Sequence, residues 1–240
     1  KKMVVVLQSS WISALILLLL LATAAVAEAV AEDIVLVQFD SSDGPLPVWK
    51  EMNDPVMGGK STGQFTVQKG MGVFTGQVVD VPFLKAPGFI QASTKGPFPD
   101  VLKCKSLAIT CRSLTDYSGY KIAFGNKRGP IDCSFFSIGY KAALPVTKMS
   151  VEEEEFETIV IPFDEFSNCN DDGTGLPIRT CLEDSKVCPN EKTLQDMKLI
   201  TVWGEGVAGD VHLEIKKIEA TDCDDGNPHT GNVELLRTRK

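Results

Sequence analysis

Histidine, tryptophan and tyrosine are scarce in this chain of 240 residues. It has two His, three Trp and three Tyr, with no Cys-x-x-Cys pair and no Gly-rich βαβ fingerprint. The missing ligand spacing argues against a zinc site and the missing fingerprint against a dinucleotide, so we expect no cofactor and no NAD. Repeats of fixed period and long helical hydrophobic patterns are also missing, which argues against repeat and helical-bundle architectures.

Positive charge is also in short supply. The chain has 24 Lys and Arg against 32 Asp and Glu, and its formal net charge is −8. An acidic domain is repelled by phosphate backbones and anionic lipid surfaces, so no nucleic acid partner is expected. The one acidic run, Glu152–Glu155, is explained by a solvated loop.

The N-terminal segment has the pattern of a targeting signal. Lys1 and Lys2 precede an apolar run from Trp11 to Leu21, and small residues follow up to Ala27. This order predicts a secretory signal peptide over residues 1–27, because an apolar run of about 17 residues is short for a membrane span. An uncleaved anchor is the alternative, and only then is a membrane partner expected. The signal predicts the secretory pathway or the extracellular space as the location.

Seven Cys follow this leader, at positions 104, 111, 133, 169, 181, 188 and 223. In an exported chain we expect three disulfides and one thiol, with a connectivity that sequence alone leaves open. Cys181 and Cys188 are the favoured pair because both lie in one polar loop, residues 167–190. That loop is longer than an ordinary connection, which indicates an insertion or a functional loop. Beyond it, residues 223–240 form a polar tail.

Short β-branched and aromatic stretches, split by Gly, Pro, Asn and Asp, fill the region between leader and tail. So many short segments without long helices predict one all-β domain over residues 28–222, a sandwich or barrel. One helical turn is predicted at Thr193–Met197. The predicted strands are Ile34–Phe39, Gln64–Val67, Val73–Val79, Phe89–Ser93, Leu107–Arg112, Tyr120–Phe124, Ser134–Tyr140, Glu157–Phe163, Leu199–Trp203 and Val211–Ile218.

A G-x-S-x-G string at residues 59–63 matches the nucleophile elbow of hydrolases. An elbow needs a helix after its Ser, whereas an alternating β pattern follows Ser61. His212 and His229 are the only candidate bases. A hydrolase is therefore the third hypothesis for function, and no catalytic residue is assigned.

Asn168, Asn170 and Asp172 match the opening of a calcium-binding loop. The twelfth position of that loop is Arg179 where a bidentate Glu is needed, and no helices flank it. A calcium site unlike an EF-hand is thus the alternative to a solvated turn, and no other metal is expected.

The densest signal runs from Trp49 to Gly63. An Asn53-Asp54-Pro55 turn followed by Gly58 and Gly59 specifies backbone geometry before it specifies chemistry. One interpretation is a loop shaped to pack on Trp49. The other is a loop that is both shaped in this way and recognised by a partner.

The string NDPVMGGKSTGQF in this segment resembles the signature of the NADH:ubiquinone oxidoreductase (complex I) intermediate-associated protein 30 family. GVFTGQV at residues 72–78, FETIVIPFDEF at 156–166 and VWGEGVAGDVHLEIKKIEA at 202–220 follow in the family's order. The resemblance covers residues 48–220 and implies a jelly-roll sandwich like a galactose-binding domain. It also implies a non-catalytic, chaperone-like assembly factor in a mitochondrion or plastid. The secretory type of leader favours export instead, so the organelle is the alternative location.

Two functions therefore compete. The first is a protein-binding module that holds an intermediate of a protein complex through loops at one end of the sandwich. Its candidate residues are Asn53, Asp54, Gly58, Gly59, Ser61, Trp203, Glu205 and Gly206. The second is a secreted, lectin-like module that binds a glycan on an aromatic platform. Trp49 with Asn53 and Asp54, or Trp203 with Glu205, would supply that platform.

Overall fold

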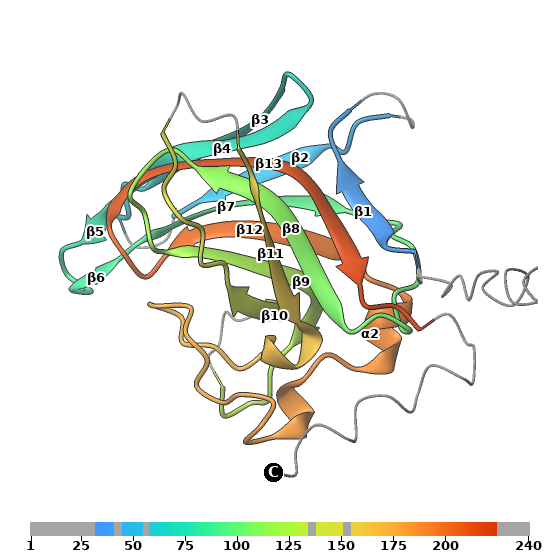
Figure 1. Cartoon of the computed structure of the whole chain (residues 1–240). Helices are drawn as coiled ribbons and strands as arrows, with labels where there is room; N and C mark the ends of the chain where they lie inside the picture. The colour runs from blue at the N-terminus through green and yellow to red at the C-terminus, as the bar shows by residue number, and fades with distance from the viewer. Residues whose placement is uncertain (1–31, 41–44, 55–57, 134–137, 151–154, 225–240) are drawn as a thin grey trace, which may run out of the picture. The chain divides into compact units, whose positions relative to one another are not determined.

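We describe the protein from a computed structural model, which covers residues 32–40, 45–54, 58–133, 138–150 and 155–224. The predicted leader, residues 1–27, and nearly all of the predicted tail, residues 223–240, lie outside these ranges. Strands dominate what the structure describes (Figure 1). Across these same residues, no helix is long and apolar enough to cross a membrane.

The larger sheet, sheet A, has the strand order β11-β8-β13-β4-β3, and β1 also pairs with β13. All of its pairs are antiparallel. β13 pairs with two strands along one side: residues 209–215 pair with β4, and residues 217–220 pair with β1. The strands of sheet A are β1 Ile34–Gln38, β3 Thr62–Gln68, β4 Met71–Val78, β8 Ser106–Ser113, β11 Glu157–Pro162 and β13 Gly209–Thr221.

The second sheet, sheet B, is also antiparallel and has the order β10-β9-β12-β7-β2. A two-stranded ribbon of β5 and β6 projects from one end of the molecule, at the left of Figure 1. The remaining strands are β2 Trp49–Asn53, β5 Asp80–Val81, β6 Ala86–Pro87, β7 Phe89–Lys95, β9 Tyr120–Arg128, β10 Ile138–Ala143 and β12 Leu199–Glu205.

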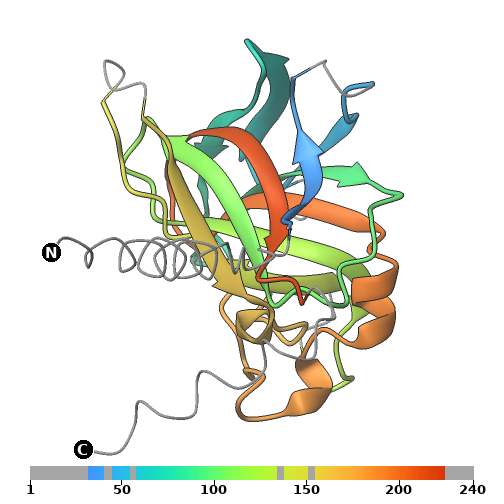
Figure 2. The same ribbon diagram turned by 45° about the vertical axis from the view of Figure 1, so that its right-hand side comes forward.

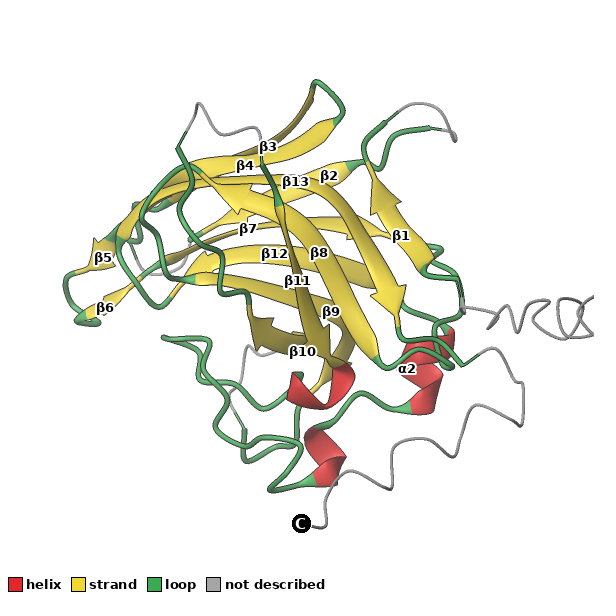
Figure 3. Ribbon diagram, in the orientation of Figure 1, coloured by secondary structure: helices red, strands yellow, loops and turns green. Residues whose placement is uncertain are grey.

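The core lies between the two sheets and follows the period of two that strands impose. Tyr120, Ile122 and Phe124 of β9 are fully buried, and Leu213 and Ile215 of β13 are buried within the same cluster. Figure 3 shows the strands as two layers with few helical turns. The prediction of an all-β jelly-roll sandwich is confirmed.

The predicted strands recur with shifted ends. The predicted strand Ser134–Tyr140 begins outside the described residues, and the structure places β10 at Ile138–Ala143. The single predicted helical turn is α2, Glu191–Gln195, which starts two residues earlier than expected because Asn190 Oδ1 accepts a hydrogen bond from the Thr193 N–H.

Strand β2 was not predicted, since Lys50 and Glu51 interrupt its apolar pattern. It forms the edge of sheet B beside β3, the edge of sheet A. The Asn53 side chain accepts from Gly63 N at 2.8 Å and donates to Gly63 O at 3.2 Å, and Glu51 Oε1 accepts from Phe65 N at 2.9 Å. These side chains satisfy backbone groups of the β3 edge and join the two sheets.

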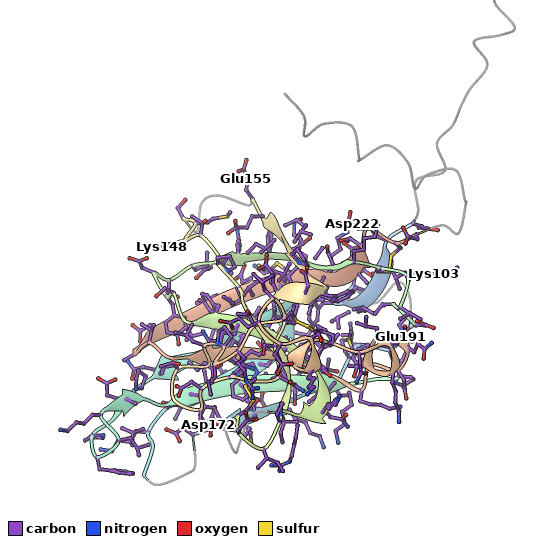
Figure 4. The ribbon with its side chains drawn as sticks, turned by 90° about the horizontal axis from the view of Figure 1, so that it is seen from below. Lys103, Lys148, Glu155, Asp172, Glu191 and Asp222 are labelled. Carbon is purple, nitrogen blue, oxygen red and sulfur yellow. A yellow bond between two sulfur atoms is a disulfide. The ribbon has the colours of Figure 1, made fainter. Side chains whose placement is uncertain are left out.

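Three disulfides cross-link the domain, Cys104–Cys223, Cys133–Cys169 and Cys181–Cys188. The last is the pair favoured from the sequence. Figure 4 shows Lys103 and Asp222, the chain neighbours of the first pair, at one corner of the molecule. Cys111 is the free thiol; it is fully buried in β8, and burial raises its pKa to about 12.

The Cys-rich loop, residues 167–190, runs from the edge of sheet B onto its outer face. Ser167 extends β10 by exchanging backbone hydrogen bonds of 2.8 and 3.1 Å with Lys141. Further along, the backbone at Gly175 lies against Glu205 and Lys121 on the outer face. In Figures 1 and 2 this orange segment lies beyond β9 and β10, on the side away from sheet A.

Candidate functional site

Residues of the NDPVMGGKSTGQF segment enclose the carboxylate of Asp54, and we call this arrangement the signature frame. Asp54 is buried, and its backbone N–H donates to Phe89 O at 3.1 Å. A Cβ at either Gly59 or Gly88 would overlap the Asp54 carboxylate. The two glycines therefore leave the space that this side chain occupies, whereas Pro55, Val56 and Met57 of the same motif lie outside the described residues.

Ser61 belongs to the same frame. It is buried, and its Oγ accepts from the Val79 N–H at 3.0 Å and donates to Val79 O at 3.4 Å. His212 lies on β13 with Nε2 at 3.3 Å from Glu214 Oε1, and His229 falls outside the described residues. In the described part of the chain, no His forms a hydrogen bond with Ser61, so a nucleophile–base pair is not assembled there.

The structure brings together the two loops that the sequence singled out. Asp54 bonds to Phe89, and Glu205 lies opposite Phe89 in the pairing of β12 with β7. Both loops thus end beside the start of β7. We call this region the loop end and define it as residues 54, 58–61, 82–88, 171–176 and 205–208.

The other members of the loop end come from the β5–β6 ribbon and the Cys-rich loop. The Cβ position of Gly58 is 3.9 Å from the Phe83 ring, and that of Gly173 is 4.0 Å from Ala86 Cβ. Gly206 has a φ of +77°, and a Cβ there would strike the backbone of Thr174, so glycine is required on two grounds.

Large apolar side chains are exposed at the loop end. Phe83 and Leu84, at the tip of the β5–β6 ribbon, are 57% and 52% exposed, and Leu176 of the Cys-rich loop is 54% exposed. Val207, between β12 and β13, is 40% exposed. Three segments that are distant in sequence therefore present apolar surface at one end of the sandwich.

A buried charged cluster lies next to the loop end, on the outer face of sheet B. Lys141 Nζ is 2.6 Å from Glu205 Oε1 and 4.0 Å from the centre of the Trp203 ring. Lys121 lies opposite Trp203 in the β9–β12 pairing and is also buried. Burial lowers the pKa of Lys121, while the nearby Glu205 opposes that shift and Lys141 adds to it.

The sequence analysis missed both lysines of this cluster. Each sits on a strand where alternate residues are apolar, so the pattern assigns it to a solvent-exposed face. Their burial depends on the Cys-rich loop, which no local pattern places over them. Glu205, in contrast, was predicted as a binding residue because it lies between Trp203 and Gly206 in a candidate loop.

Comparison with known protein families supplies the identification. The model for complex I intermediate-associated protein 30 (CIA30) matches residues 37–181. The chain belongs to the CIA30 family. Among curated protein sequences, no match was found for this CIA30 domain.

Solved structures that resemble this CIA30 domain do so distantly. One is the family 11 carbohydrate-binding module from Clostridium thermocellum in complex with a β-1,3-1,4-mixed-linked tetrasaccharide, with 15% identity and a TM-score of 0.49. The alignment covers 79% of our chain and 96% of that one. Another is the family 11 module of the cellulosomal cellulase Lic26A-Cel5E of the same organism, with 13% identity, a TM-score of 0.47 and coverage of 81% and 99%.

The two tryptophans of the CIA30 domain occupy different environments. Trp49 stacks on Phe65 at 4.1 Å between ring centroids and also packs on Phe39, so its ring belongs to the edge of the core. Trp203 lies on the outer face of sheet B and packs against Phe89 at 5.5 Å. An aromatic surface next to the loop end is thus formed by Trp203 and not by Trp49.

The predicted calcium ligands meet different partners. Asn168 and Asn170 are buried and donate to Arg128 O and Ser167 O, whereas Asp172 is exposed on the loop (Figure 4). The neighbouring Asp171, not Asp172, organises the turn, and its hydrogen bond to Thr174 lowers its pKa. Over the described residues, no group of three His, Cys, Asp or Glu is placed to hold a metal.

Proposed function

We propose that this CIA30 domain is a non-catalytic protein-binding module that recognises an intermediate of a protein complex through its loop end. The observation that carries the proposal is the exposure of Phe83, Leu84, Leu176 and Val207 at one end of the sandwich. Large apolar side chains that are exposed at one end of a folded domain typically mark a site of association. Membership of a family named for association with complex intermediates supports the same reading.

The polar groups around this surface favour binding over catalysis. Asn53 and Ser61 use their side chains on the backbone of β3 and β4–β5, and Glu205 is held by Lys141. Groups committed to structural hydrogen bonds are poorly placed to act as a nucleophile or a base. The frame therefore fixes the loop positions, and the apolar side chains supply the contact surface.

We infer further that the domain folds in an oxidising compartment. Three disulfides among seven Cys are typical of proteins that leave the cytosol. The hydrophobic pattern of residues 1–27 agrees with such a route.

Site-specific photocrosslinking tests the proposal. A photoreactive amino acid at position 84 should give a discrete, saturable adduct with one protein in the native compartment. The same amino acid at position 160, an equally exposed apolar site on β11 of sheet A, is the matched control. Phe83→Ser combined with Leu176→Ser should abolish the adduct without unfolding the domain. Equal adducts from positions 84 and 160 would refute a dedicated surface.

A glycan-binding module is the second candidate, favoured by the Trp203–Phe89 pair on the outer face of sheet B. Aromatic rings beside polar groups are the usual platform for sugar rings, and Gln91 lies opposite Trp203 on β7. A glycan array followed by titration of Trp203 fluorescence distinguishes the two functions. Saturable binding that is lost in Trp203→Ala but kept in Trp49→Phe would favour the glycan.

A further inference from the structure

Charge is unbalanced within the buried cluster on sheet B. Lys121, Lys141 and Glu205 are each more than nine-tenths buried, so two cations share one carboxylate. Lys141 holds that carboxylate at 2.6 Å. Lys121 has no hydrogen bond or ion pair with any group in the described part of the chain. Burial of an ammonium without a hydrogen-bond acceptor is costly, which singles out Lys121 as a candidate binding group.

A second donor lies beside it. Trp203 is the cross-strand neighbour of Lys121, and its indole N–H is buried with no acceptor among the described residues. Unsatisfied buried donors are rare in folded proteins and call for a specific explanation. A carboxylate has two acceptor oxygens and one negative charge, so it would supply the acceptor that Lys121 lacks, next to the Trp203 ring.

The position of the cluster connects it to the loop end. The backbone at Gly175 lies directly over Glu205 and Lys121, and Leu176 follows as one of the exposed apolar residues. Lys121 is 6% exposed, so part of its side chain still meets solvent. A side chain inserted beside Leu176 would therefore approach the ammonium from outside.

We propose that the Lys121 ammonium, flanked by Trp203 and the Lys141–Glu205 pair, binds an acidic side chain of the partner protein at the rim of the loop end. This inference rests on the proposed function, because it specifies the partner as a segment that combines apolar residues with an Asp or Glu. The carboxylate would bring the cluster to neutrality, with two cations facing two anions.

The test uses small probes on the whole folded domain. Aspartate blocked at both termini should shift the NMR signals of the Lys121 side chain and the Trp203 indole saturably. Blocked asparagine, which has the same shape without the charge, should not. Bound carboxylate also favours the charged amine, so the pKa of Lys121 should rise in the presence of the probe.

Lys121→Met separates a binding role from a structural one. The substitution keeps the aliphatic stem and removes an unpaired buried charge, so the fold should be as stable as before or more stable. Binding of blocked aspartate should weaken at least about tenfold, the expected loss of one charge-assisted hydrogen bond. Lys95→Met, on the exposed end of β7 in the same sheet, is the control and should leave the titration unchanged.

Three outcomes would overturn the inference. They are equal binding of blocked asparagine, preferential binding of inorganic phosphate or methyl glucoside, and unchanged binding in Lys121→Met. The proposed function fails separately, because Phe83→Ser does not touch the cluster and should not alter the titration. Equal adducts from positions 84 and 160 in the parent protein, together with intact aspartate binding, would discard the protein-binding surface and keep the carboxylate site.

Discussion

The signature frame and the Cys-rich loop hold their residues in place by opposite means. In the frame, hydrogen bonds to the backbone fix the side chains of Asn53 and Ser61. The Asp54 carboxylate fills the space left by the missing Cβ atoms of two glycines. In the loop, two disulfides fix the backbone while side chains such as Leu176 and Leu182 remain exposed. The NDPVMGGKSTGQF motif therefore has a structural role, whereas the exposed apolar side chains of the Cys-rich loop lie outside the quoted family motifs.

Removal of the disulfides should give the largest difference between core and loop. Cys104–Cys223 joins residues 119 apart, and Cys181–Cys188 joins residues 7 apart. The entropy of the closed loop predicts losses of about 4–5 and about 2–3 kcal/mol for the respective Ser double variants. Urea unfolding of each variant beside the parent measures both values. Equal losses would show that the length of the closed loop does not set the stabilisation.

Glycine substitutions compare the same two regions without changing covalent links. Gly88→Ala should cost about 2–3 kcal/mol, because its Cβ would displace the buried Asp54 carboxylate. Gly173→Ala in the Cys-rich loop meets its nearest atom at 3.5 Å and should change stability by less than about 0.5 kcal/mol. Thermal unfolding checks the pair. A cost for Gly173→Ala that matches Gly88→Ala would show that the loop is packed as tightly as the frame.

Ser61→Ala tests whether the hydroxyl of the frame is structural. The variant leaves the Val79 N–H without its acceptor and should lose about 1–2 kcal/mol of unfolding free energy. Thr158→Ala, whose hydroxyl meets Thr110 at an exposed site, is the matched control and should cost less. A hydrolytic activity that disappears in Ser61→Ala while stability stays unchanged would reverse the assignment.

The smallest effect at neutral pH concerns the free thiol of the core, whose contribution changes only in alkaline solution. The pKa of Cys111 is raised from 9.0 to about 12, so the unfolded chain releases this proton at lower pH than the folded one. Stability from this group is complete below pH 9 and falls by up to about 1.4 kcal/mol per pH unit between pH 9 and 12. Denaturant titrations at several pH values should show this slope, and Cys111→Ala should remove it. A slope that persists in Cys111→Ala would assign it to other groups.

The fold could be predicted from the sequence wherever a local residue pattern specifies it. Alternation along strands such as β9 and β13 predicts both the sandwich and its inward residues. β2 was not predicted because Lys50 and Glu51 interrupt its apolar pattern, and its pairing with β7 is a contact between residues distant in sequence. Lys121 and Glu205 are 84 positions apart, and both are buried only because the Cys-rich loop covers them. The pairs Cys104–Cys223 and Cys133–Cys169 could not be predicted for the same reason, whereas Cys181 and Cys188 lie in one loop.

The pairing of β1 with β13 has a consequence for how the domain can be joined to others. Ile34 lies opposite Ala220, so the first and last strands of the sandwich enter and leave at one corner. A domain whose ends are neighbours can be inserted into a loop of a host protein through short linkers, without stretching either partner. The same geometry permits circular permutation, with new ends opened far from the loop end, so that recognition and tethering can be engineered independently.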